Sequence, residues 1–379
     1  MKIGVIGAGR LGICFALLCE QAGYDVLVSD VREDYVKNLR NKFISTNEPE
    51  VAKLLSTSPR LSATTSNTKV IRECDIIYTL VATPSKKDGS YDVSAVWDVV
   101  EDFKKVKNVE GKAFVVGCTT NPEDCEQFQD ALKDLKVDVF YNPEFIAQGT
   151  IIKDLRTADM VLIGGKRNET YDQLCELYNR IQDTTPKISI MSTTAAELVK
   201  LAVNCFLTTK ISYANMVGQV MALSGMEDEI PTVLGAIGDD TRVGRKYLNF
   251  GFGFGGPCLP RDNRAFAAHA KKLGLDYNLG STTDNFNNEH ATFIKDYFVY
   301  SNPENLPFYF DYVSYKKGTD ILTESQQYRL CIDLLDDGYT VYINDIDAIM
   351  YYISSDLSAE YPDTVKFGEP DDDVYPIKF

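Results

Sequence analysis

The sequence predicts an α/β protein whose amino-terminal half is a doubly wound parallel sheet. Apolar runs recur at "KIGVI", "DVLVSD", "DIIYTLV", "AFVVGCT", "VDVFYN" and "MVLIGG", and helical stretches separate most of them. Strands that alternate with helices form a parallel sheet covered on both faces. A second strand–helix–strand region begins near Leu306, after a long helical segment. It predicts a smaller α/β domain at the carboxy-terminal end.

Composition excludes several classes of partner. The chain has 379 residues, with 39 Lys and Arg against 55 Asp and Glu, so its formal charge is −16. Such a surface repels nucleic acid and anionic membranes, and we expect neither as a partner. The nine cysteines form no CxxC and show no zinc spacing. We therefore expect reduced thiols in the cytoplasm, with no disulfide framework and no metal site.

The first strand ends in a glycine-rich turn. Gly7, Gly9 and Gly12 form G-x-G-x-x-G between "KIGVI" and the helical run "ICFALLCEQAG". The three glycines permit, in order, a tight turn, close approach of a pyrophosphate and close packing of helix on strand. Asp30 ends the next strand 18 residues after Gly12, where a carboxylate binds ribose hydroxyls. The pattern predicts a Rossmann-type site for NAD rather than NADP, although Arg32 could instead serve a 2′-phosphate.

Three domains are expected along the chain. Residues 1–190 form the NAD-binding domain. Residues 191–300 form a central helical region, in which Thr193 to about Ser224 contains no proline and no glycine before Gly218. That segment predicts one long helix or a kinked pair, acting as a spine between domains or as a subunit contact. Residues 301–379 form the smaller domain, and its acidic tail "GEPDDDVYPIKF" is expected to be poorly ordered.

The stretch "GFGFGGPCLPRD" places Cys258 after two glycine runs and Asp262 four residues later. Together with "IGAGRLG", "NPEFIAQGT", "AAELVKLAVN", "DTRVGRKYL" and "VSYKKGTDILTES", it resembles the UDP-glucose/GDP-mannose dehydrogenase family. The resemblance runs in order from Met1 to about Asp345. It implies NAD-dependent oxidation of a nucleotide-sugar CH₂OH to a carboxylate in two steps, through a cysteine-bound intermediate. The substrate it implies is UDP-glucose, with GDP-mannose or another nucleotide sugar as the alternative.

The resemblance also implies catalytic roles. Cys258 adds to the aldehyde as a thiohemiacetal and then carries the thioester, so the aldehyde is never released. Lys200 and Asn204 lie four residues apart on one helix face and stabilise the oxyanion. Lys200 and Asp262 organise a catalytic water, and Glu144 is the acid/base that assists thioester hydrolysis.

Further residues are assigned by the same resemblance. Thr83 and Thr119 contact cofactor and water, and Thr119 is also counted as catalytic. Arg242 reaches the substrate of the neighbouring subunit, so we expect a homodimer. The implied cofactor site comprises Gly7, Gly9, Leu11, Gly12, Asp30, Thr83, Thr119, Gln148 and Arg261. The implied substrate site comprises Glu144, Phe145, Gln148, Lys200, Asn204, Arg242, Tyr247, Asn249, Gly251, Gly255 and Lys316.

Five positions depart from the family pattern. They are Gln148 for a glutamate, Pro257 for a serine, Arg261 for a lysine, Thr323 for an arginine and Tyr35 for a lysine. The carboxy-terminal domain is also shortened. These departures bear on the cofactor and uridine contacts, and they leave open a non-catalytic protein that binds a nucleotide sugar. A simple hydroxyacid dehydrogenase with the same first domain is a further alternative, but it would not need the thiol.

Overall fold

The computed structural model describes residues 1–370 and 373–379. Contacts between residues divide the chain into two compact units, Met1–Lys200 and Leu201–Phe379. The boundary falls inside helix α9 (Thr193–Leu223), which is one continuous helix rather than a kinked pair. The finer division into domains of residues 1–190, 191–300 and 301–379 stays a prediction.

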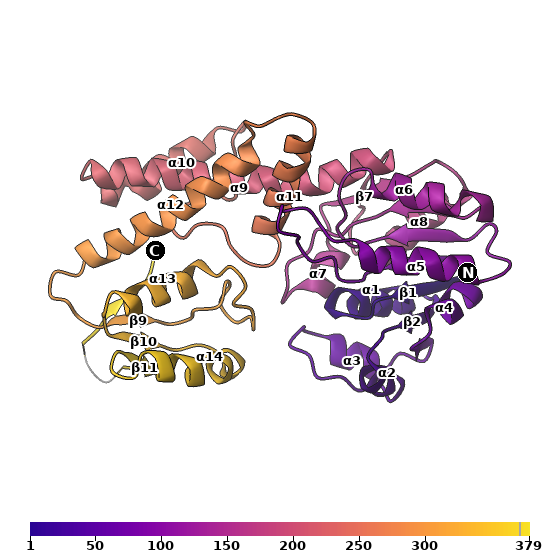
Figure 1. The fold of residues 1–379 in the computed structure, drawn as a ribbon, viewed down its shortest axis with the longest axis horizontal. Helices are drawn as coiled ribbons and strands as arrows, with labels where there is room; N and C mark the ends of the chain where they lie inside the picture. Colours follow the sequence, from indigo (N-terminus) through magenta and orange to yellow (C-terminus); the bar gives the residue numbers. More distant parts are fainter. Residues whose placement is uncertain (371–372) are drawn as a thin grey trace. The chain divides into compact units, whose positions relative to one another are not determined.

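The first unit is built on a mainly parallel sheet (Figure 1). Among the described residues the strand order is β3-β2-β1-β4-β5-β6-β7-β8. Neighbouring strands are parallel except β6 and β7, which pair antiparallel at one position, Tyr141 with Gly164. Because the order reverses between β1 and β4, a topological switch point lies there, and the predicted Rossmann-type sheet is confirmed. The strands are β1 (Lys2–Ile6), β2 (Asp25–Ser29), β3 (Leu61–Thr64), β4 (Ile76–Thr79), β5 (Ala113–Val116), β6 (Asp138–Tyr141), β7 (Met160–Gly164) and β8 (Lys187–Met191).

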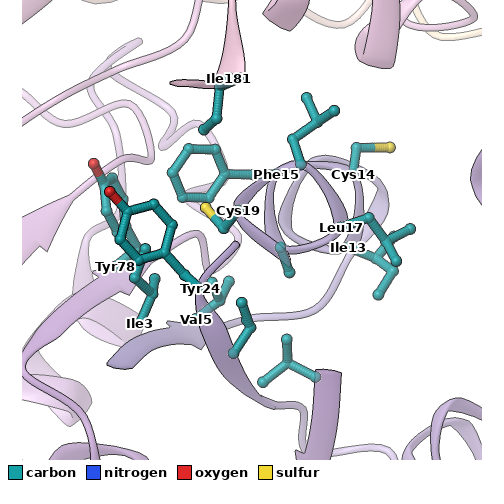
Figure 2. Packing of buried hydrophobic residues seen from close by; sticks show 14 of the residues in the cluster. Ile3, Val5, Ile13, Cys14, Phe15, Leu17, Cys19, Tyr24, Tyr78 and Ile181 are labelled. Carbon is teal, nitrogen blue, oxygen red and sulfur yellow. The ribbon is translucent and has the colours of Figure 1, made fainter. Parts of the chain in front are cut away.

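Helix α1 (Arg10–Gln21) lies in the core of this unit. It is buried from Gly12 to Glu20 and contacts α3, α7 and α8 as well as the sheet. Its Phe15 ring packs against Tyr78 of β4, with ring centroids 4.5 Å apart, beside Cys19 (Figure 2). The other α-helices before the boundary helix are α2 (Glu33–Arg40), α3 (Val51–Ser56), α4 (Asn67–Glu73), α5 (Ser94–Lys105), α6 (Asp124–Leu132), α7 (Ile151–Arg156) and α8 (Glu169–Ile181).

The second unit combines helices with a smaller parallel sheet. The strand order of that sheet is β11-β10-β9-β12. Gly218, near the carboxy-terminal end of α9, is required for packing, because a Cβ there would lie 2.1 Å from the Phe250 ring. The remaining elements are α10 (Ile230–Asp239), α11 (Leu259–Lys272), α12 (Leu279–Tyr300), β9 (Phe308–Phe310), α13 (Gln326–Asp336), β10 (Val341–Ile343), α14 (Asp347–Glu360), β11 (Val365–Phe367) and β12 (Tyr375–Pro376).

The expectation of a poorly ordered tail is wrong for residues 373–379, whereas residues 371–372 lie outside the described residues. Strand β12 pairs parallel with β9, and the Ile377 N–H donates to the Tyr309 carbonyl at 2.9 Å. The Phe379 ring lies 5.4 Å from that of Phe250 and 5.1 Å from that of Phe252. The net acidity of the tail obscures alternating apolar residues, Tyr375, Ile377 and Phe379. Ile377 is buried, and the rings of Tyr375 and Phe379 pack against neighbouring aromatic rings, which holds the segment in place.

Candidate active site

Five of the predicted site residues follow successive strands of the first sheet. Gly7 follows β1, Asp30 follows β2, Thr83 lies after β4, Thr119 after β5 and Glu144 after β6. These five strands are neighbours and run parallel, so their carboxyl ends share one edge of the sheet. In open α/β sheets this edge, at the switch point, is where ligands bind.

The glycine turn fits a dinucleotide. Gly7 has φ +93°, and a Cβ there would lie 2.7 Å from the Leu80 carbonyl oxygen. A Cβ at Gly12 would lie 1.9 Å from the Gly7 carbonyl oxygen, so both positions require glycine for packing. At Gly9, the N-cap residue of α1, a Cβ would meet no described atom within 4 Å. The space beside Gly9 and the first N–H groups of α1 can therefore receive a pyrophosphate. Leu11 is half-buried and packs against the core.

Asp30 and Arg32 form a bidentate ion pair at the same edge of the first sheet. The Arg32 Nε and Nη2 atoms donate to the two Asp30 carboxylate oxygens, each at 2.8 Å. Burial acts to raise the pKa of Asp30, but hydrogen bonds from Arg32 and its positive charge outweigh burial and lower that pKa below its ordinary value. The Arg32 guanidinium also lies 4.1 Å from the centre of the Tyr35 ring. Asp30 is thus an ionised acceptor, and Arg32 is committed to it.

Glu144 lies where β6 ends, close to Lys200. Burial raises the pKa of Glu144 to about 7, although a hydrogen bond from Tyr178 and the positive charge of Lys200 both lower it. The Lys200 ammonium lies 5.0 Å from the centre of the Phe145 ring. A carboxyl group with a pKa near neutrality can both accept and return a proton, which suits an acid/base role.

Three more of the predicted site residues, Thr83, Thr119 and Gln148, also lie in the first unit. Thr83 is buried and Thr119 half-buried. Gln148 accepts a hydrogen bond from Arg10 at 3.3 Å. Thr120, beside Thr119, is fully buried and donates to Glu197 of α9 at 2.8 Å, so the second threonine of "CTT" has a structural partner.

In the second unit, Cys258 stands at the start of α11. It is exposed, whereas Cys175 is partly buried and the other seven of the nine cysteines, all within the described residues, are buried. Asp262 follows in the first turn of the same helix and is 2% exposed. Its Oδ2 accepts a hydrogen bond from Asn204 Nδ2 at 2.6 Å. The structure therefore joins two predicted residues, Asn204 of α9 and Asp262 of α11, the helix that begins at the exposed thiol.

The loop before Cys258 is tightly packed. A Cβ at Gly255 would lie 2.2 Å from the Glu324 carbonyl oxygen. At Gly256, with φ +80°, a Cβ would lie 2.4 Å from the Tyr315 ring. At both positions the missing side chain makes room for a neighbouring group. Predicted Gly251 is held by its own backbone, since its carbonyl lies 2.7 Å from Nε2 of buried His290.

The remaining predicted contacts lie on the surface of the second unit. Arg242, Tyr247, Asn249 and Lys316 are exposed, and Arg261 is half-buried in α11. The Arg242 side chain is 86% exposed and pairs with Asp240.

Sequence reasoning missed the polar residues that hold the loop. Asn287 contacts Phe254 through both of its amide atoms, accepting from its N–H at 2.8 Å and donating to its carbonyl at 2.9 Å. Asn215 accepts from the Gly251 N–H at 3.0 Å. Asn287 and His290 are both buried on α12. A spacing of three residues places both side chains on one helix face, and this spacing was the sequence signal that could have identified them.

A Rossmann sheet with this glycine turn and ionised Asp30 defines a NAD-binding oxidoreductase. Residues 1–182 match the NAD binding domain of the UDP-glucose/GDP-mannose dehydrogenase family, and residues 194–289 match the central domain of that family. The chain belongs to this family. It is therefore a NAD-dependent nucleotide-sugar dehydrogenase by family.

Individual relatives agree with the family. The chain is 27% identical over 355 residues to UDP-glucose 6-dehydrogenase of Rickettsia bellii, covering 92% of this chain and 81% of that protein. It is 32% identical over 278 residues to an uncharacterised protein of Methanocaldococcus jannaschii, covering 72% of this chain but only 31% of that protein. Among solved structures, a UDP-glucose dehydrogenase from Pyrobaculum islandicum is 27% identical with a TM-score of 0.82, covering 97% and 86% of the two chains.

One further structure shows the fold alone. A UDP-D-ManNAc dehydrogenase from Pyrococcus horikoshii is 20% identical with a TM-score of 0.78, covering 100% of this chain and 98% of that one. Among the described residues, no helix is both long and apolar enough to span a membrane. Nor does any group of three or more His, Cys, Asp or Glu side chains in residues 1–370 and 373–379 form a metal-binding cluster.

Proposed function

We propose that the protein oxidises UDP-glucose to UDP-glucuronate in two successive NAD-dependent steps at Cys258. The observation that carries the proposal is the exposed thiol at the start of α11, one turn before buried Asp262 and its partner Asn204. A helix N-terminus favours negative charge, so the position suits a thiolate nucleophile. A dehydrogenase that stopped at the aldehyde would have no use for it.

NAD, when bound, supplies the hydride acceptor for each oxidation. After the first oxidation of the sugar C6, the Cys258 sulfur adds to the aldehyde carbon and a carbon–sulfur bond forms. Lys200 and Asn204 stabilise the resulting oxyanion. After the second oxidation the carbon is a thioester. Water then adds to the thioester and Glu144 takes one proton from it. The carbon–sulfur bond breaks to restore the thiolate and release the carboxylic acid, which loses its remaining proton to solvent as the carboxylate.

UDP-glucose is proposed over other nucleotide sugars because the Rickettsia and Pyrobaculum relatives bear that substrate in their names. The family description also includes GDP-mannose, and the Pyrococcus structure is of an enzyme for UDP-D-ManNAc. The same thiol chemistry serves any of these sugars, since it acts on the CH₂OH group alone. The base and the sugar are therefore the part of the proposal that a substrate panel must decide.

A homodimer is proposed through α9. The helix exposes large apolar side chains at intervals of three, four and seven residues, which form one stripe from near its middle to its last residue. The stripe comprises Phe206 (65% exposed), Tyr213 (44%), Met216 (44%), Val220 (60%) and Leu223 (79%). A second copy of the same helix is the proposed cover of this stripe, and exposed Arg242 would then complete the neighbour's site.

A cytoplasmic location is proposed on the chemistry of the cysteines. None of the nine forms a disulfide, and all lie within the described residues. A nucleophilic thiol that must stay reduced suits a reducing compartment.

The test of the function is a panel of UDP-glucose, UDP-N-acetylmannosamine and GDP-mannose, scored by kcat/KM with NAD. The highest value is expected for UDP-glucose. A higher value for another sugar would replace the substrate and keep the chemistry. No NADH formation with any nucleotide sugar, in a protein that binds NAD, would favour the non-catalytic alternative.

A further inference from the structure

A chain of hydrogen bonds runs from Glu144 into the core of the first unit. The Tyr178 hydroxyl of α8 lies 2.7 Å from Glu144 Oε1 and also 2.7 Å from Asn142 Oδ1. The Tyr78 hydroxyl of β4 donates to the same Asn142 oxygen at 3.0 Å. Asn142 Nδ2 donates to the Leu162 carbonyl at 2.9 Å, which fixes Oδ1 as the acceptor. Asn142 and both tyrosines are at most 2% exposed.

This chain of hydrogen bonds has too few hydroxyl hydrogens for Tyr178 to donate to both of its oxygen neighbours at once. Tyr178 has one hydroxyl hydrogen and two oxygen neighbours at equal distance. When Glu144 is ionised, Tyr178 must donate to it, and Asn142 keeps the hydrogen from Tyr78. When Glu144 is protonated, its own hydrogen goes to the Tyr178 oxygen, and Tyr178 then donates to Asn142. Either protonation state of Glu144 is thus hydrogen-bonded, provided that the Tyr178 hydroxyl rotates.

The charges around Glu144 make this rotation matter. The ionisable groups that act on its carboxyl are Lys200 from α9, Tyr178 from α8, Tyr78 from β4 and Cys19 from α1. Burial raises the pKa of each tyrosine and of the Cys19 thiol well above ordinary values, so these three groups are neutral. Lys200 is the cation of the set. The neutral Tyr178 hydroxyl therefore donates a hydrogen bond to this half-buried carboxylate when Glu144 is ionised.

We propose that Tyr178 is a positioning residue for Glu144, and that its hydroxyl hydrogen moves between the carboxylate and Asn142 as Glu144 loses and gains its proton. The inference rests on the proposed function. In thioester hydrolysis, Glu144 takes a proton from the attacking water and later passes it to solvent. Tyr178 holds the carboxyl in place through both states. The ring of Tyr78 packs on Phe15 (Figure 2). Its hydroxyl donates a hydrogen bond to Asn142 Oδ1 while Tyr178 donates to Glu144.

The test is the pH profile of Tyr178→Phe. The carboxylate loses a charge-assisted bond, whereas the acid loses only a weaker neutral one, so the Glu144 pKa should rise. The limb of the kcat profile that reports Glu144 should move up by about one pH unit, the shift expected from one hydrogen bond. Tyr78→Phe should move it in the same direction by less, because Asn142 then competes for the Tyr178 hydrogen. An unmoved limb in Tyr178→Phe would overturn the proposal.

A matched control is Tyr24→Phe, which alters a buried tyrosine of the same core that does not contact Glu144. It should leave the limb unchanged, and an equal shift there would also overturn the proposal. The ionisation of Glu144 can be read without turnover, from the infrared carbonyl band of the protonated acid that Glu144→Gln lacks. Movement of that band's titration in Tyr178→Phe supports the proposal even if no sugar is oxidised, and an unmoved titration contradicts it. Failure of the inference is thus distinguishable from failure of the proposed function.

Discussion

Asp30 and Arg32 form one ion pair at the edge of the sheet where we propose that the dinucleotide binds. The motif alone left two alternatives, a carboxylate that binds ribose hydroxyls or an arginine that binds a 2′-phosphate. In the structure both guanidinium contacts go to the Asp30 oxygens, which keeps Arg32 from acting as an unpaired cation. The aspartate therefore both repels the phosphate and engages the residue that could attract it.

Asp30→Ala should change the cofactor preference. The variant should lose about tenfold or more in kcat/KM with NAD, since bonds to a charged group are removed. It should gain with NADP, because Arg32 becomes available to a phosphate. Kinetics with both cofactors measure this, and the double variant Asp30→Ala with Arg32→Ala should lose the gain alone. An unchanged NADP value in the single variant would contradict the role of Arg32.

Residues with local spacing could be predicted from the sequence, and residues joined across the fold could not. Gly7, Asp30 and Cys258 stand in short motifs whose spacing carries the chemistry. Tyr178 meets Glu144 across 34 positions of sequence, and Tyr78 meets Asn142 across 64. No periodicity in one sequence encodes such pairs, because they arise from the order in which strands enter the sheet.

At the scale of elements, the turn between β1 and α1 has two kinds of glycine. The Gly7 carbonyl oxygen occupies the space that a side chain at Gly12 would need, whereas the corresponding space at Gly9 is open. The apolar spacing of its residues predicts helix α1. The tail strand β12 was not predicted, because its two paired residues are too few to leave a sequence pattern. Long, strongly apolar elements were therefore predictable, and the closing strand was not.

Gly9→Ala and Gly12→Ala form a matched pair. Gly12→Ala should lower the free energy of unfolding by about 2 kcal/mol or more, since its methyl would overlap backbone. Gly9→Ala should unfold like the wild type but bind NAD about tenfold more weakly, because its methyl occupies the space for the pyrophosphate. Thermal unfolding and NAD titration measure the two effects. Equal destabilisation by both variants would contradict the assignment of the space beside Gly9 to the cofactor.

At the scale of the whole molecule, the apolar stripe on α9 predicts the oligomer. Val220→Asp combined with Leu223→Asp should produce monomers, because burying two carboxylates against a second helix is unfavourable. Light scattering measures the mass, with Tyr351→Asp on exposed α14 as the control. The wild type and the control should remain dimers. A monomeric wild type with full activity would contradict both the interface and the role of Arg242.

Residues proposed for catalysis lie in both units: Glu144 and Lys200 in the first, and Cys258, Asn204 and Asp262 in the second. A thiol nucleophile is required only if one enzyme removes four electrons from the same carbon. The number of NADH molecules formed per sugar therefore tests the thiol chemistry, as the sugar itself tests the substrate.

The measurement is the number of NADH molecules formed per UDP-glucose consumed, with the products identified, for wild type and Cys258→Ser. Cys175→Ser, at a partly buried cysteine, is the control and should behave like the wild type. The wild type should form two NADH and UDP-glucuronate with little free aldehyde. Cys258→Ser should bind NAD but make almost no acid, since a serine hydroxyl is a far poorer nucleophile. One NADH per sugar in the wild type, or acid formed by Cys258→Ser at the wild-type rate, would contradict the account.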